Sequence, residues 1–250
     1  SIKTLAVSYY ARGQSSKYTM DLNNRKDFLF LILSGLFIAN ALLGEILGGK
    51  LIQVGPYVMS LGVIPWPVVF LSTDLINEYF GRAGVKRLTF VTVGLILYAF
   101  VVIFAAMGIP AASVSPVKDE AFNSVLGQSQ WIIAGSVIAF VISQLTDVFV
   151  FWLLRDATKG KMLWLRATGS TAVSQLIDTI VILGIAFWLP GKIDIKTFFN
   201  LALSSYTYKF GIAVALTPVI YAVHGMIDRY LGKEALGMIQ HAAVASRRAT

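Results

Sequence analysis

The sequence contains no cysteine and only two histidines, His224 and His241, both near its carboxyl end. Without thiols the chain forms no disulfide, holds no thiolate-bound metal and offers no cysteine nucleophile. Two histidines in one terminal segment are also too few for a histidine-rich metal site. We therefore expect neither a metal ion nor a cofactor.

Charged residues are scarce as well. They make up 14% of the 250 residues, against 56% hydrophobic residues, whereas soluble domains average roughly 25% charged residues. So few charges could not cover the surface of a soluble globule of this size, and they are clustered between long apolar runs. This distribution predicts an integral membrane protein. The net charge of +8 comes from basic clusters in particular segments, which is typical of membrane topology rather than of nucleic-acid binding.

Six apolar segments are each near the ~20 residues that an α-helix needs to cross a bilayer. They predict transmembrane helices at 28–48, 57–80, 87–108, 131–154, 169–189 and 199–223. The predicted fold class is all-α, a polytopic bundle over 28–223 with an amino-terminal arm at 1–27 and a carboxyl-terminal tail at 224–250. The arm has no short apolar core before a cleavage site, so we expect no cleavable signal peptide. Pro65 and Pro67 predict a kink in the second helix.

The basic residues predict the orientation. Sixteen of the 21 lysines and arginines lie in the terminal segments and in the loops at 82–87 and 155–166, which share one side of the membrane if there are six spans. The opposite loops hold only Lys50, Lys118, Lys192 and Lys196. Because positive charge is retained in the cytoplasm, both termini are predicted to be cytoplasmic.

Six ionisable residues lie inside the predicted spans, where each costs a few kcal/mol by insertion scales. They are Glu45, Asp74, Glu78, Asp147, Asp178 and Lys209. Glu78 sits at a membrane boundary and can pair with Arg82, and Glu45 is expected at the outer interface. The three aspartates form either a structural ion network with Lys209 or, as we favour, part of a polar substrate cavity.

Amide side chains accompany the three aspartates at three-residue spacing, which places each pair on one helix face. The pairs are Asn77 with Asp74, Gln144 with Asp147, and Gln175 with Asp178, and Asn40 of the first helix reaches a comparable depth. Two of the pairs belong to an internal repeat, because Ser143–Asp147 (SQLTD) resembles Ser174–Asp178 (SQLID). The copies lie on antiparallel helices, and we expect them to have paired roles.

Several segments together resemble the queuosine-precursor transporters, six-span bacterial proteins of the vitamin-uptake-transporter-like group. The stretch Pro67–Gly81 (PVVFLSTDLINEYFG) is similar to the family signature, and Gln144–Val148 (QLTDV) to the fourth helix. Trp164–Thr171 (WLRATGST) followed by Ser174–Asp178 resembles the fifth helix, and Tyr208–Phe210 (YKF) with Leu216–Pro218 (LTP) resembles the sixth. The resemblance runs from about residue 28 to 232.

The resemblance implies a multi-pass transporter, not an enzyme, in the bacterial cytoplasmic (inner) membrane. Its substrate would be a 7-deazaguanine base: 7-cyano-7-deazaguanine, the 7-aminomethyl relative or queuine, which feed the wobble-base modification of tRNA. A carboxylate accepts the two parallel N–H donors of a guanine-like edge as it accepts an arginine fork. Asp147 or Asp178 is the candidate for this role, and Lys209, Gln144 or Gln175 can donate to the 6-oxo group.

The predicted substrate-binding residues are Asp74, Asn77, Asp147, Gln144, Asp178, Gln175, Lys209 and Asn40. Planar bases also stack on aromatic rings, and the candidate platforms are Trp66, Phe70, Phe140 and Tyr206.

Energy coupling is open at this point. Acidic residues outnumber basic residues within the predicted spans, which suggests the hypothesis of a proton relay. The expected partners are a deazapurine substrate, membrane lipid and a coupling proton or ion. The sequence has no phosphate-cradling loop, so we expect no ATP hydrolysis by this chain; the alternative is a substrate-binding component of an ATP-driven importer.

An intramembrane enzyme agrees less well with the sequence, because there is no Gly-x-Ser-x-Gly elbow and no His-Glu-x-x-His pair. A channel would usually repeat one pore motif.

Overall fold

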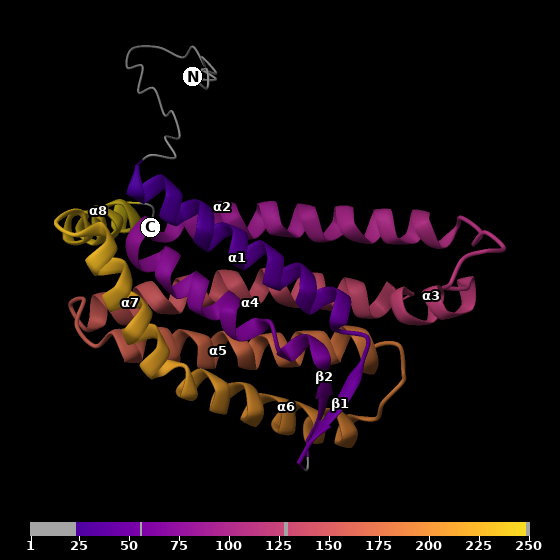
Figure 1. Cartoon of the computed structure of the whole chain (residues 1–250). Helices are drawn as coiled ribbons and strands as arrows, with labels where there is room; N and C mark the ends of the chain where they lie inside the picture. Colours follow the sequence, from indigo (N-terminus) through magenta and orange to yellow (C-terminus); the bar gives the residue numbers. More distant parts are fainter. Residues whose placement is uncertain (1–23, 56, 128–129, 249–250) are drawn as a thin grey trace, which may run out of the picture.

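The computed structural model describes residues 24–55, 57–127 and 130–248, which form an elongated helical bundle (Figure 1). In chain order the elements are α1 (Arg25–Leu47), β1 (Leu51–Val54), β2 (Tyr57–Ser60), the 3₁₀ turn η1 (Leu61–Val63), α2 (Trp66–Met107), α3 (Asp119–Leu126), α4 (Gln130–Ala157), α5 (Leu163–Leu183), the π-helical turn η2 (Gly184–Trp188), α6 (Ile195–Ala215), α7 (Thr217–Leu231) and α8 (Glu234–Arg248). Among these residues, five helical stretches are long and apolar enough to cross a membrane. The predicted all-α polytopic class is confirmed.

The second of these stretches, Leu61–Met107, doubles back on itself, because α2 breaks at Gly81. This residue has φ 77° and ψ 178°, a conformation that only glycine adopts without strain. The two halves of α2 run in opposite directions from this point (Figure 1). The break predicted at Gly81-Arg82 is confirmed, but the helix resumes at Arg82 rather than after a loop at 82–87.

The predicted start of the second helix at residue 57 is wrong. Residues Tyr57–Ser60 form β2, which pairs with β1 in an antiparallel hairpin whose turn includes Gly55 at φ 57°. The two prolines do not kink a helix. Pro65 caps α2 and Pro67 lies in its first turn, where backbone N–H groups have no intrahelical acceptor, so the missing N–H of proline costs no helical hydrogen bond. A short apolar run of four residues fits a strand as well as a helix, and here the flanking turns decide.

The carboxyl-terminal part is more helical than expected. The predicted helix at 199–223 divides at Leu216, with Pro218 in the first turn of α7. The segment predicted as a tail continues α7 to Leu231 and then forms α8. Most of the predicted arm, residues 1–23, lies outside the described residues.

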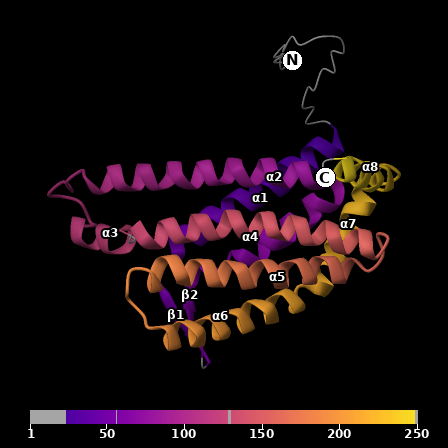
Figure 2. The same cartoon turned by 180° about the vertical axis from the view of Figure 1, so that it is seen from behind.

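Helix α4 is central to the bundle: it lies between the second half of α2 and α5 when seen from behind (Figure 2). Apolar side chains of α1, α2, α4, α7 and α8 form the core, including Phe37, Ile76, Phe140 and Phe151. The outward faces are also apolar, as at Phe90, Tyr98 and Val101 of α2, which suits contact with lipid.

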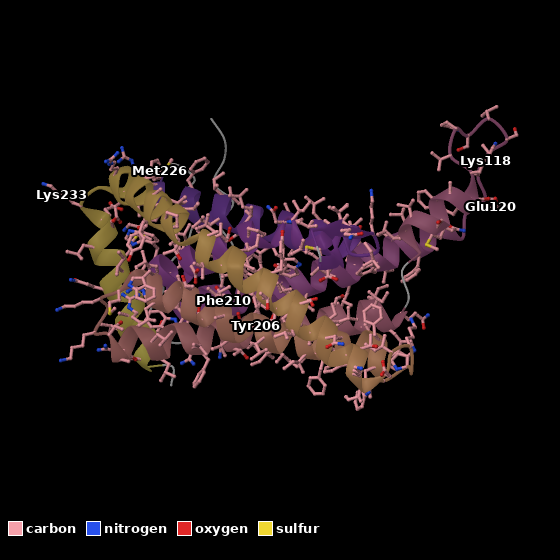
Figure 3. All side chains as sticks on the ribbon, turned by 90° about the horizontal axis from the view of Figure 1, so that it is seen from below. Lys118, Glu120, Tyr206, Phe210, Met226 and Lys233 are labelled. Carbon is pink, nitrogen blue, oxygen red and sulfur yellow. The ribbon has the colours of Figure 1, made fainter. Side chains whose placement is uncertain are left out.

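The basic segments gather at one end of the bundle. Lys26 of α1 pairs with Glu234 of α8 at 3.3 Å, and Arg247 pairs with Asp156 at the end of α4 at 2.9 Å. Lys118 and Glu120 lie at the opposite end from Lys233 (Figure 3). This arrangement agrees with an even number of crossings, while the side of the membrane that the basic end faces stays a prediction.

Candidate functional site

Buried polar residues concentrate on three helices, the first half of α2, α4 and α5. Polar groups away from water need partners, because each unpaired group costs free energy comparable to a lost hydrogen bond. The buried set comprises Ser72, Thr73, Asp74, Asn77, Glu78, Ser143, Gln144, Asp147, Arg155, Arg166, Ser170, Thr171, Ser174, Gln175 and Thr179.

Glu78 is the centre of a buried ion cluster. Its Oε2 atom lies 2.8 Å from Nη2 of Arg166 and 3.2 Å from Nη1 of Arg155. The predicted pairing with Arg82 is therefore wrong; the Arg82 guanidinium instead lies over the ring of Phe149, 5.9 Å from its centroid. The two arginines neutralise Glu78 from α4 and α5, so the cluster joins three helices.

Sequence reasoning missed Arg155 and Arg166 as buried groups because both were assigned to a basic loop. Their spacing carried a usable signal. Arg155 follows Asp147 by eight residues, and Arg166 precedes Ser170 and Ser174 by four and eight, so each shares a helix face with the repeat.

The two copies of the repeat meet in the interior. Ser174 Oγ of the second copy donates to Asp147 Oδ1 of the first at 3.2 Å. Asp178 is engaged elsewhere: Lys209 Nζ of α6 donates to its Oδ2 at 2.7 Å and to Thr179 Oγ1 at 3.3 Å. The predicted network of three aspartates with Lys209 is thus limited to Asp178.

Asp74 differs from the other two aspartates. Its side chain is buried, with 5% of the residue exposed. Within the described residues its Oδ1 atom has no hydrogen-bond partner, and neither has Nδ2 of Asn77 one turn later. Asn77 uses its oxygen to accept from Trp152 Nε1 at 3.3 Å. A buried carboxylate oxygen without a partner has free capacity for donors of a ligand.

Asp74 opens into a recess between α2, α5, α6 and α7. The recess has about 290 Å³ of space, open solvent included. Its lining is Phe70, Leu71, Asp74, Ala167, Thr168, Thr171, Ala213, Leu216, Thr217 and Ile220. Thr168 and Thr217 are hydrogen-bonded at 2.9 Å across one wall.

A second recess of about 220 Å³ adjoins the first, because both are lined by Phe70. It is lined by Val63, Trp66, Pro67, Phe70, Gln175, Lys209 and Ile212. Trp66, Phe70 and Asp74 follow one another at four-residue spacing, so one face of α2 lines both recesses. Trp66 and Phe70 are stacked, with ring centroids 6.0 Å apart and an interplanar angle of 20°. Both recesses are narrow and admit only water-sized groups in this conformation.

The other predicted site residues lie outside these recesses. Asn40 donates to the Leu36 carbonyl of its own helix at 2.9 Å, and Gln144 lies against Thr73 at 3.4 Å. Phe140 packs in the core between Phe37 and Trp66.

Tyr206 and Glu45 are also placed away from the recesses. Tyr206 stacks on Phe210 along α6 (Figure 3). Glu45 was expected at the outer interface, which stays a prediction; it lies near the end of α1, beside Ser136 of α4, and only 6% of it is exposed.

Comparison with known proteins identifies the family of this chain. Residues 60–223 match the family described as "Putative vitamin uptake transporter", and this range includes every residue that lines the two recesses. The chain is 30% identical over 190 residues to the "Probable queuosine precursor transporter" of Bacillus subtilis, covering 71% of this chain and 77% of the relative. The chain belongs to the queuosine-precursor transporter family.

Two further queuosine-precursor transporters agree. The "Queuosine precursor transporter" of Escherichia coli is 28% identical over 193 residues, 72% of this chain and 79% of the relative. The "Probable queuosine precursor transporter" of Haemophilus influenzae is 27% identical over 169 residues, 65% of this chain and 66% of the relative. No solved structure matches the chain. As a queuosine-precursor transporter, the chain is a multi-pass membrane transporter for a small molecule and not an enzyme.

Proposed function

We propose that this transporter imports a 7-deazaguanine base, such as 7-cyano-7-deazaguanine, its 7-aminomethyl relative or queuine, through the two recesses between α2, α5 and α6. The observation that carries the proposal is the free Oδ1 of Asp74 beside Phe70. A 7-deazaguanine presents two parallel N–H donors on one edge and an acceptor beside them, on a flat ring. An ionised carboxylate next to an aromatic ring matches both features.

Asp74 is a better candidate for the donor edge than the two aspartates first considered. Asp147 already accepts from Ser174, and Asp178 is bound to Lys209. Neither of them lines a recess, whereas Asp74 does. We therefore assign the bidentate contact to Asp74.

The second recess suits the rest of the base. Trp66 and Phe70 provide a stacking surface, which contributes roughly 1–3 kcal/mol per stacked base. Lys209 and Gln175 supply donors for the 6-oxo group or the 7-substituent. Within the described residues the Gln175 side chain makes no hydrogen bond of its own, and only its backbone carbonyl accepts, from Thr179.

Binding requires the recesses to widen, and α6 is the wall best able to move. Only Phe198, Ala202 and Ala213 of α6 are buried, and the helix ends at the break before Pro218. Few buried contacts mean that a displacement of α6 disrupts little of the core. If the basic end faces the cytoplasm of a bacterial inner membrane, this movement carries the base inward.

Thermal unfolding of the detergent-purified protein tests the assignment. A ligand at about 100 times its Kd stabilises the folded state by about 2.7 kcal/mol, so 7-cyano-7-deazaguanine should raise the melting temperature. Adenine, which lacks the donor edge, should leave it unchanged. Asp74→Asn should abolish the shift, and Asp156→Asn, an exposed acid paired with Arg247, should retain it. If the folded wild-type protein responds to no deazaguanine, the proposal is wrong.

A further inference from the structure

The buried ions around Asp74 do not balance. Three carboxylates, Asp74, Glu78 and Asp147, are buried with two guanidinium groups, Arg155 and Arg166. Three negative charges minus two positive charges leave one negative charge. An uncompensated charge away from water costs several kcal/mol, so such groups bind a proton or a cation instead.

The excess charge belongs to Asp74 and Asp147. Glu78 is in direct contact with both arginines, whereas neither Asp74 nor Asp147 forms an ion pair within the described residues. The contact of Thr73 with Gln144 at 3.4 Å brings α2 and α4 together beside Asp74 and Asp147. Two buried carboxyl groups on facing helices, neither with an ion-pair partner among the described residues, share one proton more readily than they both ionise.

Other charged groups near this pair are already matched. Asp178 of α5 holds Lys209 of α6 at 2.7 Å. At the basic end, Asp228 of α7 accepts from Tyr79 and lies 3.1 Å from His224. Glu45 of α1 is buried near the other end of the bundle, beside Ser136. Within the ion cluster of α2, α4 and α5, the unbalanced charge therefore lies on Asp74 and Asp147.

We propose that Asp147 carries the coupling proton of this transporter while Asp74 stays ionised to hold the substrate. The inference rests on the proposed function of Asp74. With one proton on Asp147 the cluster is neutral, and the donor edge of the base binds an ionised Asp74. Asp147 accepts from Ser174 through Oδ1, and Ser170 lies beside the same carboxyl group. The proton enters from the outer side with the base and leaves to the cytoplasm with it, so base and proton move in the same direction.

The test uses the purified full chain in liposomes, with 7-cyano-7-deazaguanine as the probe. A gradient of one pH unit, acidic outside, should drive about tenfold accumulation of the base for one proton per cycle. An internal pH dye should report acidification when the base is added. A protonophore should abolish both signals.

Asp147→Asn mimics the protonated side chain and separates coupling from binding. It should still exchange labelled for unlabelled base across the membrane, but it should lose accumulation and acidification. Glu45→Gln removes a buried acid outside the cluster and should accumulate the base like the wild type. The inference is overturned if Asp147→Asn still accumulates the base, or if Glu45→Gln no longer does. It is also overturned if a sodium gradient, and not the pH gradient, drives accumulation. Absence of any exchange by the wild type would instead contradict the proposed function.

Discussion

Ser174 of α5 donates a hydrogen bond to Asp147 of α4 at 3.2 Å, and the two residues hold the first and the last position of equivalent five-residue repeats. The helices are antiparallel, and a Cβ added to Gly135 of α4 would lie 3.2 Å from the backbone nitrogen of Ala186. Gly135 lies twelve residues before Asp147, and Ala186 lies twelve residues after Ser174. The two antiparallel helices therefore keep one register between these two contacts. In that register Ser143 is level with Asp178, yet Asp178 bonds to Lys209 instead. The repeat is symmetric in sequence and asymmetric in its contacts.

Ser174→Ala should destabilise the fold modestly, because it removes a donor from a buried carboxylate. A hydrogen bond contributes about 0.5–1.5 kcal/mol in soluble proteins and about 0.6 kcal/mol on average between membrane helices. We expect a loss within that range in denaturant unfolding in detergent. Thr146→Ala, whose hydroxyl bonds only to its own helix, is the matched control. Equal losses in the two variants would show that the Ser174–Asp147 bond has no special weight.

Glu78→Gln should be severely destabilising. The substitution leaves Arg155 and Arg166 buried without the carboxylate that contacts both, and removal of one partner from a buried pair costs about 3–5 kcal/mol. The melting temperature and the yield of monodisperse protein should both fall. Glu120→Gln, a change at an exposed acid in α3, should change neither. A Glu78→Gln protein as stable as the wild type would contradict the role of the ion cluster.

Gly81→Ala tests the reversal of α2. Gly81 has φ 77°, and a Cβ there would lie 3.0 Å from Oγ of Ser246 and 3.3 Å from the Ala242 carbonyl oxygen of α8. Backbone strain of this kind costs about 1–3 kcal/mol. A melt should show that loss for Gly81→Ala but not for Gly94→Ala, since no atom lies within 4 Å of a Cβ at Gly94. An unstrained Gly81→Ala protein would place the turn elsewhere.

Phe70→Ala should weaken binding of 7-cyano-7-deazaguanine, since Phe70 is the residue common to both recesses. Loss of about 1–3 kcal/mol of stacking corresponds to roughly a 5- to 150-fold rise in Kd, measurable by titration calorimetry. Tyr206→Ala removes an aromatic side chain that lines neither recess and should keep the wild-type Kd. A reversed pattern would move the stacking site to α6.

Much of the fold was predictable because lipid imposes a simple rule. A crossing needs about 20 apolar residues, so the six spans and the break at Gly81 follow from the sequence. Residues 57–60 were misassigned because a short apolar run fits either a strand or a helix. The divided helix at Pro218 was missed because proline is tolerated within membrane helices.

The site was predictable only in part. Buried acids are conspicuous within apolar runs, so Asp74, Asp147 and Asp178 were found at once. Their partners depend on how the helices turn toward each other, which no local pattern records. For that reason the pairing of Glu78 with Arg155 and Arg166 and the free oxygen of Asp74 emerged only from the structure.

The most direct test of the account measures queuosine in tRNA. The chain would be expressed in a bacterium that can neither make 7-deazaguanine bases nor import them, and 7-cyano-7-deazaguanine would be added to the medium. We predict that queuosine reappears in tRNA with the wild-type chain and not with Asp74→Asn at equal membrane abundance. If tRNA stays unmodified with a folded, membrane-inserted wild-type chain, or if Asp74→Asn restores queuosine as well, the assigned substrate or the role of Asp74 is wrong.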